Sequence, residues 1–382
     1  DMGKMATDAI HAGEIETRPS GAVVLPIFQS ATFEYGGQDD YHDLKYIRLN
    51  NTPNHQVLHD KLAILEGGEA ALVTASGMAA ITTLLLTVLK QGDHLLAQDC
   101  LYGGTVTFLT QDIADYGIGV GFFAGNDPDS WEALLRPETR AIYVEPMTNP
   151  LLEVADLDAV VAFAKKHNLL AIIDNTFASP VNFQPLKIGF DVVVHSCTKY
   201  LNGHSDIVAG GIVGTRELIT RVTHRLNHLG ASLDPHACFL LHRGIKTLVL
   251  RVKQQNENAL SLATFLNKHP KVEAVYYPGI EDHPQYTRAS RLFDGCGGVL
   301  SFEVKGSADD ADRLMSRLKL SVVAPSLGGV ETLITRPVQT SHAGLSREQR
   351  KAAGISDKLI RVAVGIEDGE DICADFEQAL SD

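Results

Sequence analysis

Three short polar segments, each directly after a run of apolar residues, carry groups that could act together on one ligand. The first holds Gly77 and Met78 at the expected start of a helix, where bare backbone N–H groups favour an anion. The second ends in Asp174, a carboxylate that could pair with a protonated ring nitrogen. The third holds Lys199, whose amine could form a covalent bond with a carbonyl carbon.

An anion, a ring nitrogen and a carbonyl carbon are the reactive parts of pyridoxal phosphate (PLP), which we predict as the cofactor. The hydroxyls of Ser196 and Thr198 would add donors to its phosphate. Each of these residues alone also suits a helix cap, a turn or a solvated surface, so the prediction depends on their order along the chain. A dinucleotide site is the competing interpretation, but no Gly-x-Gly-x-x-Gly motif follows a strand.

The elements that must position these groups are short runs of Val, Ile, Leu and Ala, typical of buried strands. Helical patterns separate most of them, which predicts right-handed crossovers and an α/β fold with a mixed, mostly parallel sheet of seven strands. The last gap is too short for a crossover, so the final strand should run antiparallel. The runs are Ala70–Thr74, His94–Ala97, Ile118–Phe123, Ala141–Glu145, Leu169–Asp174, Asp191–His195 and Ala209–Val213.

Three parts are expected along the chain. Residues 1–45 have turn signals and little periodicity, and form an N-terminal arm. Residues 46–240 form the PLP-binding domain, whose ligand lies at the carboxyl ends of the strands. Residues 241–382 alternate long helical and β-like segments and form a smaller C-terminal α+β domain.

Composition excludes several classes of protein. The 33 Lys and Arg residues against 47 Asp and Glu give a charge of −14, which argues against nucleic acid as a partner. No apolar run approaches the roughly 20 residues that span a bilayer, so no membrane is expected. Five scattered cysteines suit a reducing compartment, and the absence of a visible secretory signal predicts a cytoplasmic location. No cysteine–histidine pairing suggests zinc, and no metal is predicted.

Motifs along nearly the whole chain resemble those of the PLP-dependent enzymes of cysteine and methionine metabolism, the trans-sulfuration family. The segments that carry the resemblance are Pro26–Phe33, Leu65–Glu69, Ala75–Ala80, Tyr102–Thr105, Glu145–Pro150, Asp174–Phe177, Ser196–His204, Ser326–Leu333 and Leu359–Gly365. The resemblance implies fold type I of the PLP-dependent transferases.

The resemblance also implies roles for individual residues. Lys199 would hold PLP and later carry protons, and Tyr102 would stack on the ring and assist proton transfer. Asp174 would pair with the ring nitrogen, with Thr176 nearby. The implied phosphate ligands are Gly77, Met78, Ser196 and Thr198.

Two further groups follow from the same resemblance. Arg361 would clamp the substrate carboxylate, helped by Asn149 and Ser326. Tyr46 and Arg48 would reach the phosphate of a neighbouring subunit, which implies a dimer with shared active sites and a homotetramer of two such dimers.

The chain departs from the family pattern at three places. The usual Asn-Pro-Thr-Arg is replaced by Asn51-Thr52-Pro53-Asn54. Gly104 stands where methionine γ-lyases usually have cysteine. Pro325 stands where enzymes acting on cystathionine often have glutamate.

We therefore expect elimination or replacement at the γ-carbon of a sulfur- or oxygen-substituted amino acid, similar to cystathionine γ-lyase or γ-synthase. The alternatives are a β-eliminating carbon–sulfur lyase, a methionine γ-lyase or an O-acylhomoserine sulfhydrylase. A catalytically silent structural protein is the alternative outside enzymes, and the intact set of lysine, aspartate and arginine disfavours it.

Overall fold

The computed structural model describes residues 4–381, so the first three residues of the predicted arm and the last residue of the predicted C-terminal domain lie outside it. The chain forms two compact units. Of the described residues, the first unit comprises 4–146 and 156–249, and the second 147–155 and 250–381. The predicted three-part division stays a prediction.

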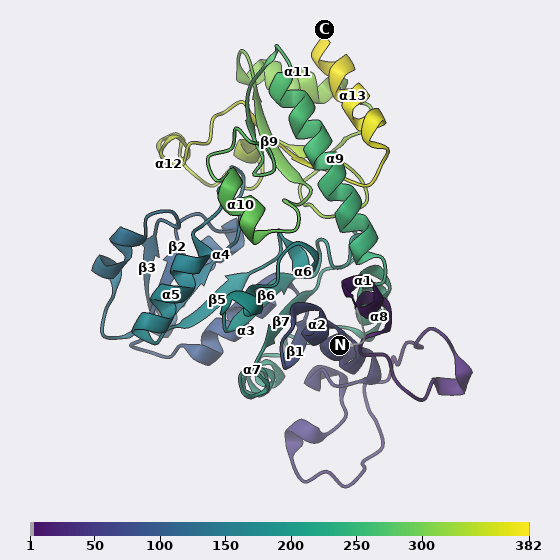
Figure 1. The fold of residues 1–382 in the computed structure, drawn as a ribbon. Helices are drawn as coiled ribbons and strands as arrows, with labels where there is room; N and C mark the ends of the chain where they lie inside the picture. The colour runs from purple at the N-terminus through teal and green to yellow at the C-terminus, as the bar shows by residue number, and fades with distance from the viewer. Residues whose placement is uncertain (1–3, 382) are drawn as a thin grey trace. The chain divides into compact units, whose positions relative to one another are not determined.

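A seven-stranded sheet forms the centre of the first unit, in the order β1-β7-β6-β5-β4-β2-β3 (Figure 1). Its strands are β1 Ala70–Thr74, β2 His94–Gln98, β3 Gly119–Phe123, β4 Thr139–Val144, β5 Leu170–Asp174, β6 Val192–Ser196 and β7 Gly210–Gly214. Strand β7 is antiparallel to both of its neighbours, and the other strands run parallel to one another. The expected α/β class, the seven strands and the antiparallel last strand are confirmed.

Helices cover both faces of this sheet (Figure 1). The helices of this unit are α1 Met5–His11, α2 Pro53–Glu66, α3 Gly77–Val88, α4 Gly103–Thr107, α5 Leu157–His167, α6 Ser179–Asn182, α7 Arg216–Leu229 and α8 Pro235–Ile245, of which α1 and α8 pack on α2. Leu84 of α3 and Val222 of α7 pack in one core with Ile172 and Val194 of the sheet. Burying each such side chain stabilises the fold by about 1.5–3 kcal/mol.

The second unit contains a five-stranded sheet in the order β10-β11-β12-β9-β8. Its strands are β8 Val272–Tyr276, β9 Val299–Val304, β10 Val322–Val323, β11 Leu333–Thr335 and β12 Leu359–Ala363. Its helices are α9 Leu248–Lys268, which begins at the boundary of the units, α10 Tyr286–Leu292, α11 Ala308–Arg317, α12 Arg347–Ala352 and α13 Gly369–Ser381. Leu262, Phe302 and Phe376 belong to its apolar core.

Loops of the N-terminal segment extend from the first unit and contain only short helical turns (Figure 1). The turns are Pro19–Gly21, Tyr41–Asp43 and Ile47–Leu49. Among residues 4–381, no helix is long and apolar enough to cross a membrane.

Candidate active site

The start of α3 lies against the end of β6, so two groups of predicted phosphate ligands come together. The Ser76 hydroxyl accepts a hydrogen bond of 2.9 Å from the backbone N–H of Ala79 and caps the helix. A Cβ atom on Gly77 would lie only 2.9 Å from Cβ of Ser196 and 3.1 Å from its hydroxyl. Glycine is therefore required for this close approach, which places free N–H groups of a helix beside a hydroxyl, as an anion site needs.

The turn after β6 carries Lys199 and is held by backbone hydrogen bonds at both of its ends. The Lys199 N–H donates to the Ser196 carbonyl at 3.2 Å, and the Gly203 N–H donates to the Lys199 carbonyl at 2.7 Å. The Thr198 hydroxyl donates to the carbonyl of Ala209 and accepts from its N–H, at 3.3 and 3.1 Å. Thr198 therefore ties this turn to the segment that leads into β7.

Asp174 ends β5 as a buried carboxylate with two fixed donors. Its Oδ1 accepts hydrogen bonds from the hydroxyl of Thr176 at 2.5 Å and from the backbone N–H of Thr176 at 3.1 Å. The Thr176 hydroxyl accepts from the backbone N–H of Ser196 at 2.8 Å, which joins the ends of β5 and β6. Burial raises the pKa of Asp174, and the hydrogen bonds from Thr176 oppose that shift. A cationic partner, such as a protonated ring nitrogen, would stabilise the carboxylate here.

A second buried carboxyl group, Glu145, lies beside Asp174 and holds the loop of Tyr102. Glu145 Oε1 accepts a hydrogen bond of 2.7 Å from the Tyr102 N–H. Burial raises the pKa of Glu145 well above its ordinary value, and the negative charge of Asp174 raises it further. The sequence alone assigned no role to Glu145. Its place directly after a buried strand was the signal that could have identified it as a site residue.

The ring of Tyr102 is half-exposed and flanks Gly104 together with Met78. A Cβ atom on Gly104 would lie 2.6 Å from Cε1 of Tyr102 and 3.0 Å from the sulfur of Met78. The predicted stacking residue and a predicted phosphate ligand therefore lie close together. Glycine at position 104 leaves the space that the tyrosine ring fills in this conformation.

In the second unit, the three predicted substrate ligands form one cluster. Arg361 on β12 is buried, and its guanidinium donates to Asn149 Oδ1 at 3.2 Å and to the Ser326 carbonyl at 2.9 Å. Ser326 has φ of 89°, a strained conformation for an L-residue that often marks functional sites. Burial lowers the pKa of His342, a neighbour that sequence reasoning missed, and the charge of Arg361 lowers it further.

Tyr46 and Arg48 lie together, at the short turn Ile47–Leu49 rather than among the strand-end residues. The guanidinium carbon of Arg48 lies 5.4 Å from the centre of the Tyr46 ring, a cation–π distance. Arg48 also donates to the carbonyl of Asn227 on α7 at 2.8 Å and to the hydroxyl of Tyr41 at 2.6 Å. The predicted contact of this pair with a neighbouring subunit stays a prediction.

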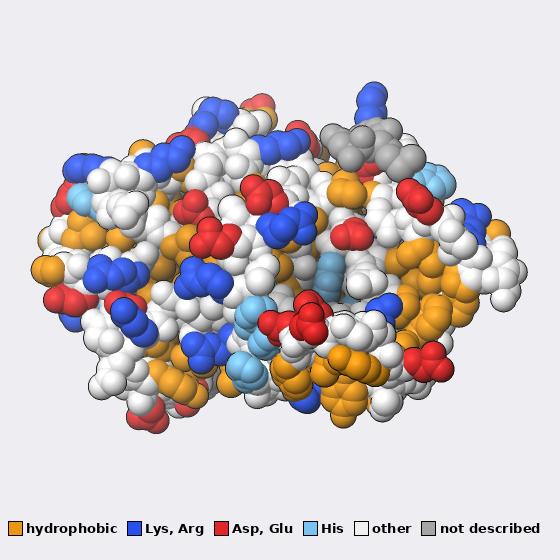
Figure 2. All heavy atoms as spheres, turned by 90° about the horizontal axis from the view of Figure 1, so that it is seen from below, with side chains coloured by type: hydrophobic (Ala, Val, Ile, Leu, Met, Phe, Trp, Pro, Cys, Tyr) orange, Lys and Arg blue, Asp and Glu red, His pale blue; other side chains and the backbone are white. Residues whose placement is uncertain are grey.

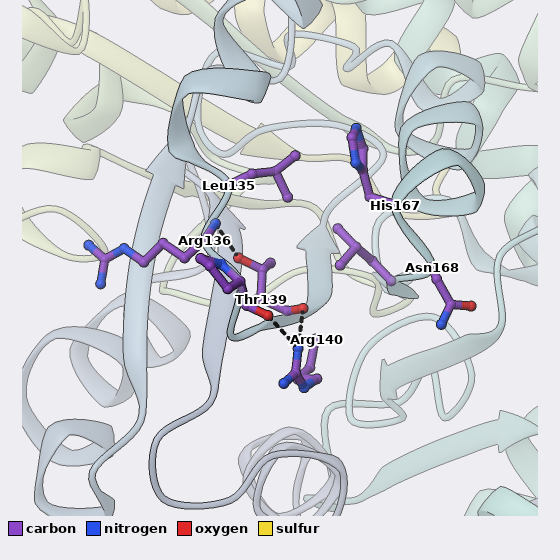
Figure 3. A pocket seen from close by; sticks show the side chains of 8 residues that line it. Leu135, Arg136, Thr139, Arg140, His167 and Asn168 are labelled. Atoms are coloured by element: carbon purple, nitrogen blue, oxygen red, sulfur yellow. Dashed lines mark hydrogen bonds between the residues drawn. The ribbon is translucent and has the colours of Figure 1, made fainter.

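A cavity of about 540 Å³ lies away from all of these residues. Its lining includes Thr139 and Leu169, at the amino ends of β4 and β5 rather than at their carboxyl ends. The guanidinium groups of Arg136 and Arg140 point in different directions there (Figure 3). This cavity is therefore no candidate for the active site. In the part of the chain that the structure describes, no cluster of His, Cys, Asp or Glu could hold a metal ion.

The chain matches a known protein family and several known proteins. Residues 6–381 match the family model described as Cys/Met metabolism PLP-dependent enzyme. The chain is 42% identical to an L-methionine γ-lyase of Fusobacterium nucleatum subsp. polymorphum, over 98% of each chain. It is also 42% identical to a cystathionine γ-lyase of Bacillus subtilis, over 99% of each chain. A solved cystathionine γ-synthase of Xanthomonas oryzae pv. oryzae has a TM-score of 0.95 and 37% identity, covering 100% of this chain and 98% of that one.

The residues of the first unit fit PLP by their chemistry: helix N–H groups beside a hydroxyl, a buried carboxylate, an adjacent aromatic ring and a lysine one turn away. The α/β fold and these strand-end groups define an enzyme that depends on PLP. Within that class, the chain belongs to the Cys/Met metabolism PLP-dependent enzymes.

Proposed function

We propose that this enzyme eliminates or replaces a substituent on the γ-carbon of a sulfur- or oxygen-substituted amino acid, in the manner of cystathionine γ-lyase or γ-synthase. The observation that carries the proposal is the set of strand-end residues around Lys199, together with the names of the relatives. Those relatives are called methionine γ-lyase, cystathionine γ-lyase and cystathionine γ-synthase.

When bound, PLP supplies an electron sink for charge that develops on the substrate carbon. The protein's own residues hold and direct that chemistry. Lys199 binds the cofactor and then moves protons at its Nζ atom. Asp174, oriented by Thr176, holds a proton on the ring nitrogen. The N–H groups of Gly77 and Met78 and the hydroxyls of Ser196 and Thr198 bind the phosphate.

We assign recognition of the substrate carboxylate to the cluster in the second unit. Arg361 presents a planar guanidinium that Asn149 and the Ser326 carbonyl hold in place. A guanidinium can bind a carboxylate through two parallel hydrogen bonds, and this geometry favours arginine over lysine. Tyr102 stacks on the ring and assists proton transfer.

We further propose a homotetramer of two dimers that share active sites, in which Tyr46 and Arg48 bind the phosphate of the neighbouring subunit. Apolar side chains of the arm support this, because Val23 and Tyr35 are each 72% exposed. Hydrophobic side chains gather in patches on the face shown in Figure 2. A partner subunit would bury such patches. The cytoplasmic location also remains our prediction.

Methionine γ-lyase is the second candidate function. Pro325 supplies no carboxylate for the distal amino group of cystathionine, and several relatives of the chain carry that name. Gly104, where such enzymes usually have cysteine, stands against it.

Product analysis tests the proposal. The purified enzyme, loaded with PLP, would be incubated with L-cystathionine, L-methionine and O-acetyl-L-homoserine, each with and without L-cysteine. We expect 2-oxobutyrate from γ-elimination, or a thioether when cysteine is present. Pyruvate as the main keto acid from cystathionine would contradict the proposal and identify a β-eliminating lyase. Turnover of methionine in preference to cystathionine would favour the second candidate.

A further inference from the structure

A buried carboxylate lies on the first unit's sheet, separate from the proposed site. Glu66, the last residue of α2, is fully buried. Its Oε1 lies 2.5 Å from Nε2 of His195 and accepts a hydrogen bond of 3.0 Å from Nδ2 of Asn175. His195 and Asn175 are themselves buried. One carboxylate oxygen therefore joins side chains from two neighbouring strand ends.

These two side chains are sequence neighbours of the proposed cofactor ligands. Asn175 follows Asp174, and His195 precedes Ser196. The Asn175 N–H also donates to the carbonyl of Val194 at 3.0 Å. Any movement of Glu66 would therefore be transmitted directly to the residues proposed to hold the ring nitrogen and the phosphate.

Glu66 and His195 lie on the face of the sheet opposite the core that α3 covers. Successive side chains of a strand point to opposite faces, and Val194 packs into that core. His195 therefore projects to the other face, where it meets Glu66. Asp174 is paired with Val194 in the sheet, so its side chain lies on the face opposite Glu66. Glu66 therefore affects Asp174 through the sheet and does not itself contact a ligand.

His195, the partner of Glu66, also influences Asp174 through its charge. A carboxylate at the C-terminal end of a helix is disfavoured by the helix dipole, and a buried one needs hydrogen-bond donors or a cation beside it. His195 pairs directly with Glu66 from α2 and interacts electrostatically with Asp174 from β5, while its partner on β7 is Gly211. The charge of His195 lowers the pKa of Asp174 against the larger effect of burial.

We propose that Glu66 is a positioning residue for the cofactor site: through Asn175 and His195 it fixes the spacing of Asp174 and Ser196. This inference rests on the proposed roles of Asp174 and Ser196. Glu66 touches neither cofactor nor substrate, and its effect on both is exerted through its two neighbours.

The dissociation constant of PLP, measured by equilibrium dialysis between pH 5.5 and 8.5, tests this without relying on turnover. Glu66→Gln keeps the shape and one acceptor oxygen but removes the charge. The matched control is Glu14→Gln, because Glu14 Oε1 also pairs with a histidine, His242, at 2.7 Å in the same unit. Melting curves of the variants would verify folding, and the double variant Glu66→Gln/His195→Gln replaces the pair by two neutral groups.

We expect Glu66→Gln and the double variant to weaken PLP binding about tenfold near pH 6.5. The loss of affinity on acidification should begin at higher pH than in the wild type, since Asp174 would take up a proton more readily. Glu14→Gln should match the wild type throughout. Wild-type affinity for PLP at every pH in both Glu66 variants would overturn the inference. A wild-type protein that binds no PLP would instead overturn the proposed site itself.

Discussion

The carboxyl group of Glu145 accepts a hydrogen bond of 2.7 Å from the backbone N–H of Tyr102, across 43 positions of the chain. The Glu145 N–H in turn donates to the side-chain oxygen of Gln98 at 3.0 Å, which joins β2 to the end of β4. A buried carboxyl group thus holds the backbone of Tyr102, whose half-exposed ring we propose to stack on PLP. The position of that ring depends on Glu145 as much as on its own loop.

Two substitutions of Glu145 should separate its geometry from its charge. Because burial raises the pKa of Glu145 well above its ordinary value, the folded state favours the protonated form. That contribution to stability is present at low pH and is lost as pH rises. Glu145→Gln mimics the neutral group, so its melting temperature should exceed that of the wild type by about 2–4 °C at pH 8 for each kcal/mol gained, and by less at pH 5.

Turnover by the same variants is the second measurement. Glu145→Gln keeps an acceptor for the Tyr102 N–H and should keep most of kcat/KM. Glu145→Ala removes it and should lower kcat/KM by up to about 100-fold through displacement of the ring. Equal activity of the two variants would show that the hydrogen bond does not position Tyr102.

Gly104→Ala should weaken cofactor binding, because the added Cβ would lie 2.6 Å from the ring of Tyr102 and push it aside. We expect the dissociation constant of PLP to rise about fivefold, since ring stacking contributes about 1 kcal/mol. Gly344→Ala is the matched control, because no atom lies within 4 Å of a Cβ built there. Unchanged PLP affinity in Gly104→Ala would mean that Tyr102 does not stack on the ring in this position.

The departure of residues 51–54 from the family pattern has a structural explanation. Thr52 caps α2, and its N–H donates to Nδ1 of His55 at 3.2 Å, while Nε2 of His55 bonds the Leu233 carbonyl at 2.6 Å. Asn54, at the place of the usual arginine, bonds the backbone of Phe28 and Pro26 in the arm. This segment therefore begins a helix and anchors the arm.

Burial lowers the pKa of His55 to about 4. The neutral ring is therefore the form that the fold favours. Its contribution is fully present above the unfolded-state pKa of about 6.5 and is lost as pH falls toward 4. At pH 5 the loss amounts to about 2 kcal/mol of unfolding free energy. His55→Asn, which keeps an acceptor for Thr52, should show a smaller fall in melting temperature between pH 7.5 and 5 than the wild type.

The exposed His236 provides the control for this measurement, and His236→Asn should retain the wild-type fall. If the melting temperature of His55→Asn fell as much as that of the wild type between pH 7.5 and 5, another group would cause the acid sensitivity. His59, whose pKa burial lowers to about 3, would be the next residue to replace.

The sheet was predictable because each strand is a buried apolar run bounded by turn residues, and the parallel arrangement placed Gly77, Asp174 and Lys199 at one edge. The short gap before β7 also revealed its antiparallel direction. The contacts of Glu66 with His195 and of Glu145 with Tyr102 were not predictable, because 129 and 43 positions separate the partners and neither pair has a local pattern. The clustering of Arg361 with Asn149 came only from family resemblance, since 212 positions separate them.

Lys199→Ala tests the central claim most directly. The absorption spectrum of the purified variant after incubation with PLP, and its release of keto acid from L-cystathionine, would be compared with those of the wild type. We predict loss of the visible band of the protein-bound cofactor and a fall in turnover by roughly 1,000-fold or more. A variant that kept both the band and full turnover would contradict the assignment of Lys199 and the function built on it.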